Sequence, residues 1–183
     1  MDSIETPRLL LRQWRPEDRE PFYRINSDPR VMEHFPGILS RSESDQLVVW
    51  AEAHFACHRF GPFAAELRER GQFIGFIGIS IPAFDAPFMP AVEIGWRLDP
   101  AFWNRGLATE GARAVLRYAF DVLELKDVVS FTVPDNFASR RVMEKLGMTR
   151  DPADDFDHPR LPEGHRLRRH VLYRLSNIRV RPI

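Results

Sequence analysis

Three strand-like runs between residues 63 and 98 constrain the fold of this chain more than any other part of its sequence. They read FAAEL, QFIGFIGISI and AVEIGWRL, and each is rich in aromatic or β-branched residues. The polar break RERG and the proline-rich break PAFDAPFMP separate them. Breaks this short join neighbouring strands that run in opposite directions, so we predict a three-stranded antiparallel meander.

Helix and strand patterns alternate on both sides of the meander. Before it we expect a strand at 8–13 and helices at about 16–27 and 43–59. After it we expect a helix at 107–123, a strand at 127–133, a helix at 136–146 and a last strand within 165–176. This order predicts an α+β fold, with mixed α and β structure around one mostly antiparallel sheet. The loop over residues 151–165 is long for a compact domain, which is typical of a functional or mobile segment.

Length and charge limit the class of protein. A chain of 183 residues that is 44% hydrophobic predicts one domain over residues 1–183. Its 26 Lys and Arg residues cancel its 26 Asp and Glu residues, so the field that attracts nucleic acid or an anionic membrane is missing. The single Cys57 excludes an internal disulfide, and neither a leader nor an apolar run of ~20 residues is recognisable. We therefore expect a cytoplasmic protein without nucleic-acid or membrane partners.

The stretch AFWNRGLATEG follows the third meander strand and contains small residues where a helix is expected to begin. Free main-chain amides at a helix N-terminus, together with the helix dipole, form an anion site. The alternative is that Gly106 and Ala108 only ease a tight turn from strand to helix. Neither of the common glycine-rich phosphate-loop patterns occurs in the chain.

A second stretch, VPDNFASRRVMEKLGM, follows the next expected strand. Helical spacing places four of its residues on one face: Asn136, Ser139, Arg140 and Met143. This mainly polar face begins where a strand ends, so it predicts a second group of ligand contacts close to the first.

Together the two stretches resemble the signature of the GCN5-related N-acetyltransferases (GNAT). That signature is a Q/R-x-x-G-x-G/A turn between a strand and a helix, followed one strand later by an N-x-x-A/S helix that ends in K-x-G-F. Here the first motif reads WNRGLA at 103–108, and the second reads NFAS at 136–139 with KLGM at 145–148. The wording FWNRGLATEG and ETPRLLLRQWRPED is most similar to the ribosomal-protein N-terminal acetyltransferase (RimJ/RimL-like) branch, and the resemblance covers about residues 5–175.

The resemblance implies a GNAT fold with six or seven strands, about four helices and two parallel central strands that splay apart. Acetyl-CoA, the implied cosubstrate, would lie between these strands. The main chain of one strand would pair with its pantetheine amides: Ile94, Gly95, Trp96, Arg97 and Leu98. The turn would hold the pyrophosphate through its amides: Asn104, Arg105, Gly106, Leu107, Ala108 and Thr109. Asn136 would bond the pantetheine arm, while the side chains of Arg105 and Arg140 would either reach phosphates or lie solvated on the surface.

The resemblance also implies direct attack of an amine on the thioester in a ternary complex. Met143 stands where many relatives carry a tyrosine that acts as the general acid, and methionine cannot donate a proton. We therefore predict that Ser139 hydrogen-bonds the departing sulfur, the alternative being that it caps or packs. Glu93 is the candidate base, the alternative being a surface or ion-pair role. Trp103, in place of the usual Gln or Arg, leaves only main-chain amides at the first motif position.

The predicted activity is transfer of an acetyl group to a primary amine, on a protein N-terminus or a small molecule. The alternative is a catalytically weak module that binds or senses acyl-CoA, which Met143 suggests. The run HFACH has a spacing known for zinc ligands, but we expect no metal and place His54 and His58 beside the acceptor pocket. The oligomeric state is open, with a homodimer as one option.

Overall fold

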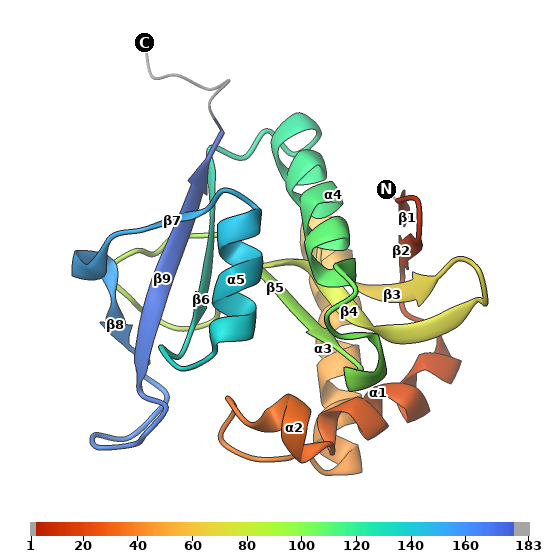
Figure 1. The fold of residues 1–183 in the computed structure, drawn as a ribbon, viewed down its shortest axis with the longest axis horizontal. Helices are drawn as coiled ribbons and strands as arrows, with labels where there is room; N and C mark the ends of the chain where they lie inside the picture. Colours follow the sequence, from red (N-terminus) through yellow and green to blue (C-terminus); the bar gives the residue numbers. More distant parts are fainter. Residues whose placement is uncertain (1–2, 178–183) are drawn as a thin grey trace.

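A sheet of nine strands forms the centre of the computed structural model, which describes residues 3–177 (Figure 1). The strands are β1 (Ser3–Glu5), β2 (Leu9–Arg12), β3 (Pro62–Leu67), β4 (Gln72–Ser80), β5 (Glu93–Leu98), β6 (Asp127–Thr132), β7 (Thr149–Arg150), β8 (Phe156–Asp157) and β9 (Arg169–Ser176). Their order is β1-β2-β3-β4-β5-β6-β9-β7, and β8 pairs with β9. Only β5 and β6 pair in parallel among these strands. The mixed α and β fold with a mostly antiparallel sheet is therefore confirmed.

The sheet has more strands than the expected six or seven because β1, β7 and β8 contain only two or three residues each. Segments this short show no alternation of apolar and polar residues, which is the signal that identifies a strand in a sequence. The three-stranded meander is confirmed, since β3 pairs antiparallel with β4 and β4 with β5.

Five α-helices lie within the described part of the chain: α1 (Arg19–Asn26), α2 (Pro29–Met32), α3 (Arg41–His58), α4 (Leu107–Asp121) and α5 (Phe137–Lys145). The expected start of α3 is two residues too late. Its N-cap is Ser40, whose main-chain N–H donates to the Glu43 carboxylate at 2.8 Å while its hydroxyl accepts from the Glu43 N–H at 3.3 Å. This capping box satisfies amides that have no partner inside the helix.

The helices pack on both faces of the sheet. In Figure 1, α4 and α5 lie in front of the central strands and α3 lies behind them. The close approach of α4 to β4 depends on Gly111, where a Cβ atom would lie 2.4 Å from Cδ1 of Ile77. Met143 of α5 is buried in the same core. None of the helices between residues 3 and 177 is long and apolar enough to cross a bilayer.

The parallel strands β5 and β6 meet only at their beginnings. Glu93 is in register with Val129, the Val129 N–H donates to the Val92 carbonyl at 2.9 Å, and the Ser130 hydroxyl donates to the Ile94 carbonyl at 2.8 Å. β5 remains paired with β4 as far as Leu98. Beyond Ile94, the other edge of β5 has no strand beside it, which is the expected splay.

Candidate active site

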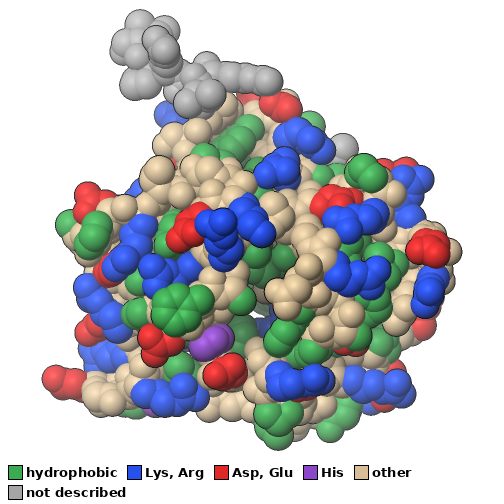
Figure 2. All heavy atoms as spheres, in the orientation of Figure 1, with side chains coloured by type: hydrophobic (Ala, Val, Ile, Leu, Met, Phe, Trp, Pro, Cys, Tyr) green, Lys and Arg blue, Asp and Glu red, His purple; other side chains and the backbone are tan. Residues whose placement is uncertain are grey.

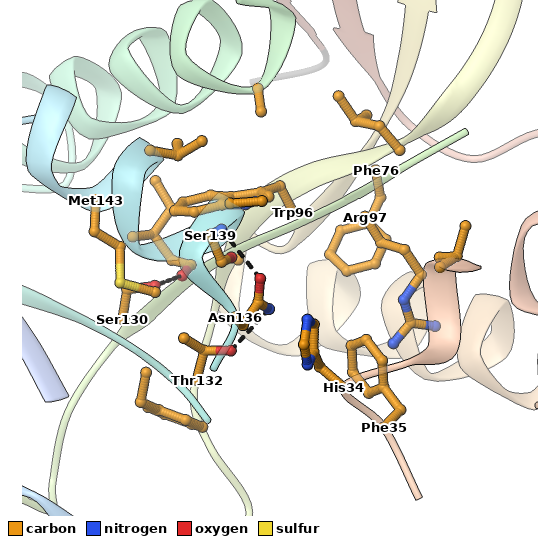
Figure 3. Close-up of a pocket in the computed structure, with 18 of the residues that line it drawn as sticks. His34, Phe35, Phe76, Trp96, Arg97, Ser130, Thr132, Asn136, Ser139 and Met143 are labelled. Carbon is orange, nitrogen blue, oxygen red and sulfur yellow. Dashed lines mark hydrogen bonds between the residues drawn. The ribbon is translucent and has the colours of Figure 1, made fainter. Parts of the chain in front are cut away.

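A cavity of about 860 Å³ lies where β5 and β6 diverge (Figure 3). Its lining comes from β5, from the turn that leads into α4, from the end of β6 with α5, and from two segments farther away in the sequence around 30–36 and 158–170. Figure 2 shows Lys and Arg side chains around the hollow on this face, with a histidine at its rim. We call the first three segments the cofactor half, after the contacts predicted for acetyl-CoA, and the last two, with Phe76 and the Arg97 side chain, the acceptor half.

The structure brings most of the predicted site residues together around this cavity. They are Glu93, Ile94, Gly95, Trp96, Arg97, Leu98, Asn104, Gly106, Leu107, Ala108, Thr109, Asn136 and Ser139. Two predicted residues do not line it. The Arg105 guanidinium lies over the Phe102 ring, 5.5 Å from its centre, and Arg140 donates to the Pro134 carbonyl at 2.8 Å. A phosphate contact by either side chain stays a prediction that needs the side chain to move.

The turn into α4 has the backbone geometry that its small residues allow. Gly106 is the N-cap of α4 with φ of +76°, and Asn104 has φ of +58°. Glycine adopts this left-handed conformation without strain, whereas a β-branched residue does so rarely. The first amides of α4, at Leu107, Ala108 and Thr109, have no carbonyl partner within the helix. They line the cavity and can donate to an anion there.

Trp103 has a role that the motif comparison missed. Its indole Nε1–H donates to the Leu98 carbonyl at 2.8 Å, which ties the turn to the end of β5. The aromatic residue at the first motif position therefore fixes the position of the turn, although it offers no charge.

Four cations surround a shallower hollow of about 570 Å³ next to the same turn, and sequence reasoning missed them: Arg8, Arg113, Arg117 and Lys145. Arg8 donates to the Arg105 carbonyl at 2.9 Å and forms an ion pair with Glu110 at 2.7 Å. The spacing of Arg113 and Arg117, four residues apart on one helix face, was the available signal. The basic group adjoins Gly106 and Thr109, so it adds positive charge next to the main-chain amides of the turn.

Asn136 and Ser139 lie at the start of α5, facing the cavity (Figure 3). The Asn136 side-chain oxygen accepts from the Ser139 main-chain N–H at 3.1 Å, and its amide donates to the Thr132 hydroxyl at 3.0 Å. Asn136 therefore caps α5, and one of its two amide hydrogens remains for a ligand. The Ser139 hydroxyl is not used in the cap and remains a candidate hydrogen-bond donor.

Glu93 is the first residue of β5 and lies just before its unpaired edge. Its carboxylate lies over Gly95, where a Cβ atom would be 3.9 Å from Glu93 Oε1. Burial raises the pKa of Glu93 to about 8. Within the described residues it has neither a hydrogen bond nor an ion pair, so the surface or ion-pair alternative receives no support. A carboxylate with a pKa near neutrality beside a free strand edge can accept a proton.

The expectation that His54 and His58 border the acceptor pocket was wrong. The buried His54 contacts the Phe60 carbonyl through Nδ1 at 2.8 Å, and its Nε2 accepts from the Ile81 N–H at 3.1 Å. Both ring nitrogens thus hold the end of α3 to neighbouring loops, and neither histidine lines the cavity. Among residues 3–177, no group of three or more metal-ligating side chains is placed to bind a metal ion.

Other histidines do line the acceptor half, and no motif pointed to them. They are His34, after α2, with His158 and His170 from the loop and strand near the C-terminus. Burial lowers the pKa of His158 and of His170 below the usual range, so both rings are neutral at pH 7. Their rings also pack within an aromatic cluster that includes Phe131 and Phe156.

A family model described as an acetyltransferase (GNAT) domain matches residues 8–149. The uncharacterized N-acetyltransferase YnaD of Bacillus subtilis is 32% identical over 149 residues, which cover 81% of this chain and 83% of YnaD. The chain belongs to the GNAT acetyltransferase family. This GNAT protein is an acetyl-CoA-dependent acetyltransferase, and its general reaction is acetyl transfer to an amine.

Other similar proteins agree with that assignment. The FsC-acetyl coenzyme A-N(2)-transacetylase of Aspergillus fumigatus is 32% identical over 154 residues, and the match spans 80% of the GNAT chain but 65% of the fungal protein. A GNAT acetyltransferase structure from Bacillus anthracis aligns with a TM-score of 0.78 at 27% identity, covering 95% of this chain and 98% of the other. Mycobacterium smegmatis RimJ in complex with CoA-disulfide has the same fold, with a TM-score of 0.75 at 20% identity over 96% of this chain and 87% of RimJ.

Proposed function

We propose that this enzyme transfers the acetyl group to a primary amine by direct attack in a ternary complex. The observation that carries the proposal is that one cavity contains both the anion-binding turn at Gly106 and the carboxylate of Glu93. The only cysteine, Cys57, is exposed on α3 and does not line the cavity, so an acetyl-cysteine intermediate has no support.

Groups in the cofactor half support acetyl-CoA binding by their chemistry. We assign the pyrophosphate of acetyl-CoA to the amides from Gly106 to Thr109. We assign the separate phosphate on its ribose to the basic group of Arg8, Arg113, Arg117 and Lys145. The unpaired edge of β5 between Gly95 and Leu98 has main-chain N–H and C=O groups. The two pantetheine amides can hydrogen-bond to these groups in the way that an added strand would. When bound, acetyl-CoA supplies the activated thioester.

Three groups of this chain would then serve the reaction. Glu93 takes a proton from the amine, whose nitrogen forms a bond with the thioester carbonyl carbon as the bond from carbon to sulfur breaks. A main-chain N–H of β5 near Gly95 or Trp96 donates to the carbonyl oxygen. The Ser139 hydroxyl donates a hydrogen bond to the departing thiolate, because none of the cavity-lining residues in the described chain is a tyrosine.

The pKa of Glu93 favours one class of amine. An α-amino group has a pKa of about 7.7–8.0, whereas that of a lysine side chain is about 10.4. Because burial raises the pKa of Glu93 to about 8, proton transfer from an α-ammonium group is nearly balanced in free energy. This match supports a protein or peptide N-terminus as acceptor, and with it the ribosomal-protein N-terminal acetyltransferase branch.

The test is acetyl-CoA-dependent thiol release with a panel of peptides, amino acids, polyamines and aminoglycosides. We expect turnover with at least one α-amine at a higher kcat/KM than with any lysine-type amine. If acetyl-CoA raises the melting temperature but no amine turns over, the sensing module suggested by the missing tyrosine is the better account.

A further inference from the structure

Arg97 carries a positive charge into the acceptor half of the cavity without a matching carboxylate. Its Nη1 donates to the Asn26 side-chain oxygen at 2.6 Å, and this is its one side-chain hydrogen bond among the described residues. Its Nε is buried and has no hydrogen-bond partner there. Glu33 also lines the cavity, yet no ion pair joins it to Arg97 within residues 3–177. The guanidinium thus keeps unused donors beside the cavity.

Arg12, a buried arginine on another strand, has a structural role and provides a comparison. Arg12 on β2 pairs with Asp18 and with Glu66, each at 2.7 Å. Burial without such partners lowers the pKa of Arg97 to about 10, which means that its charged form is disfavoured where it lies. Arg97 is half-buried, and a partly desolvated charge without an ion-pair partner is costly, so an anionic ligand would remove part of that cost.

The surroundings of Arg97 hold its guanidinium in one place. The Phe35 ring lies 4.3 Å from it and the Phe76 ring 5.8 Å, measured to the ring centres. Asn26 is itself fixed, because its amide donates to the Ser44 hydroxyl at 2.9 Å. In Figure 3 the Arg97 side chain lies beside Phe35 and His34, across the hollow from Asn136. A planar cation held in this way is suited to bidentate binding of a carboxylate.

The position of Arg97 on β5 relates it to the proposed reaction centre. Side chains alternate along a strand, so Glu93, Gly95 and Arg97 point to the same face. Gly95 leaves the space between the other two open. Glu93 and Arg97 are four residues apart on the strand, so their Cα atoms are about 13 Å apart. This distance matches about four residues of an extended peptide.

We propose that Arg97 binds a carboxylate of the acceptor, so that the substrate is a peptide-like amine with an acidic group about three or four residues from its amino terminus. This inference rests on the proposed acetyl transfer at Glu93 and names the acceptor class for it. Polycationic amines such as polyamines and aminoglycosides are excluded, because they would bring further positive charge to an uncompensated guanidinium.

The test compares pentapeptide amides that share an N-terminal serine and differ only at the third or only at the fourth position, which is aspartate, asparagine or lysine. With the wild-type enzyme we expect kcat/KM for the aspartate peptide to exceed that for the asparagine peptide about tenfold or more, with the lysine peptide lowest, since a charge-assisted hydrogen bond contributes about 1.5–3 kcal/mol. Arg97→Gln should remove the preference, and Arg97→Lys should retain part of it. The control Arg24→Gln, at an exposed site on α1 outside the cavity, should keep the wild-type ranking.

Wild-type turnover that ignores the residue at both positions, or that prefers lysine there, overturns the inference and leaves acetyl transfer intact. Absence of turnover with every peptide and every small amine instead sinks the proposed function, and the inference with it. Each variant is first shown to be folded by its melting temperature and by its shift with acetyl-CoA. If both Arg97 variants fail to fold, the wild-type ranking alone decides.

Discussion

The two halves of the cavity are built from different parts of the chain. The cofactor half uses main chain: the amides of the turn at 104–109 and the unpaired edge of β5. The acceptor half uses side chains from separate segments, among them His34, Phe35, Phe76, Arg97 and His170. A ligand can approach the main chain only where residues are small and regularly spaced, so this kind of binding produces a motif in the sequence. Side chains that come together only in the fold produce no such motif.

The largest expected effect concerns Glu93, the proposed base. Glu93→Gln should lower kcat/KM about 100-fold, the lower range for loss of a general base. In the wild type, kcat/KM should rise with pH until about 8, as the carboxyl with its raised pKa loses its proton. The variant should lack this contribution to the pH profile in a thiol-release assay.

The matched control is Glu69→Gln, an exposed carboxylate in the turn between β3 and β4. It should leave both the rate and the pH profile unchanged. An E93Q enzyme with the wild-type profile would show that Glu93 is not the base.

The next effect isolates the cofactor half. Gly106→Val should weaken acetyl-CoA binding about 30-fold, because a β-branched residue at φ of +76° adds strain of about 1–3 kcal/mol and displaces the first amides of α4. Isothermal titration calorimetry measures the affinity. Gly71→Val is the control, since Gly71 has φ of +60° in the turn between β3 and β4 and lines neither hollow. Equal loss of affinity in both variants would contradict the assignment of the turn.

Ser139→Ala tests the donor to the leaving sulfur. We expect kcat to fall about tenfold, the size of one lost hydrogen bond to a charged group, while the Kd for acetyl-CoA stays unchanged. The Asn136 cap should persist, because it accepts from the main-chain N–H of Ser139. Ser139→Thr keeps the hydroxyl and should keep most of the activity, and a fully active alanine variant would assign Ser139 to packing alone.

The smallest effect is on stability. Because the pKa of Glu93 is raised in the folded state, the native protein holds a proton that the unfolded chain has lost between about pH 4.5 and 8. The contribution of Glu93 to stability is therefore most favourable at low pH and falls as pH rises through that window. The melting temperature of E93Q relative to wild type should be a few degrees higher at pH 9 than at pH 5. Differential scanning calorimetry at both values tests this, and an equal difference at both would mean that the carboxyl is not buried.

Much of the fold could be predicted from the sequence because apolar residues recur with a regular period in long strands and amphipathic helices. The meander, α4 and α5 lie within a few residues of their expected positions. The four-residue α2 and the shortest strands are too short to show such a period, so they were not predicted. The expected start of α3 at residue 43 was two residues late, although S-x-x-E at 40–43 is the sequence pattern of the capping box that the structure shows.

The candidate site divides in the same way. The cofactor-side residues were found by motif, whereas the side-chain role of Arg97 depends on Asn26 and Phe35, about 60–70 positions earlier in the chain. Met143 lines the same cavity as Asn136 and Ser139, as helical spacing predicted, and its burial in the core is what the spacing alone did not indicate. His54 looked like a pocket residue, but its two ring nitrogens are both used in holding loops.

A crystal structure of the enzyme with CoA tests the central claim most directly, since it locates pyrophosphate and sulfur in one experiment. We predict pyrophosphate oxygens on the amides of residues 106–109, and the sulfur within hydrogen-bond reach of the Ser139 hydroxyl, facing Glu93. A pyrophosphate bound away from the start of α4, or a sulfur on the far side of β5 from Glu93, would contradict the account.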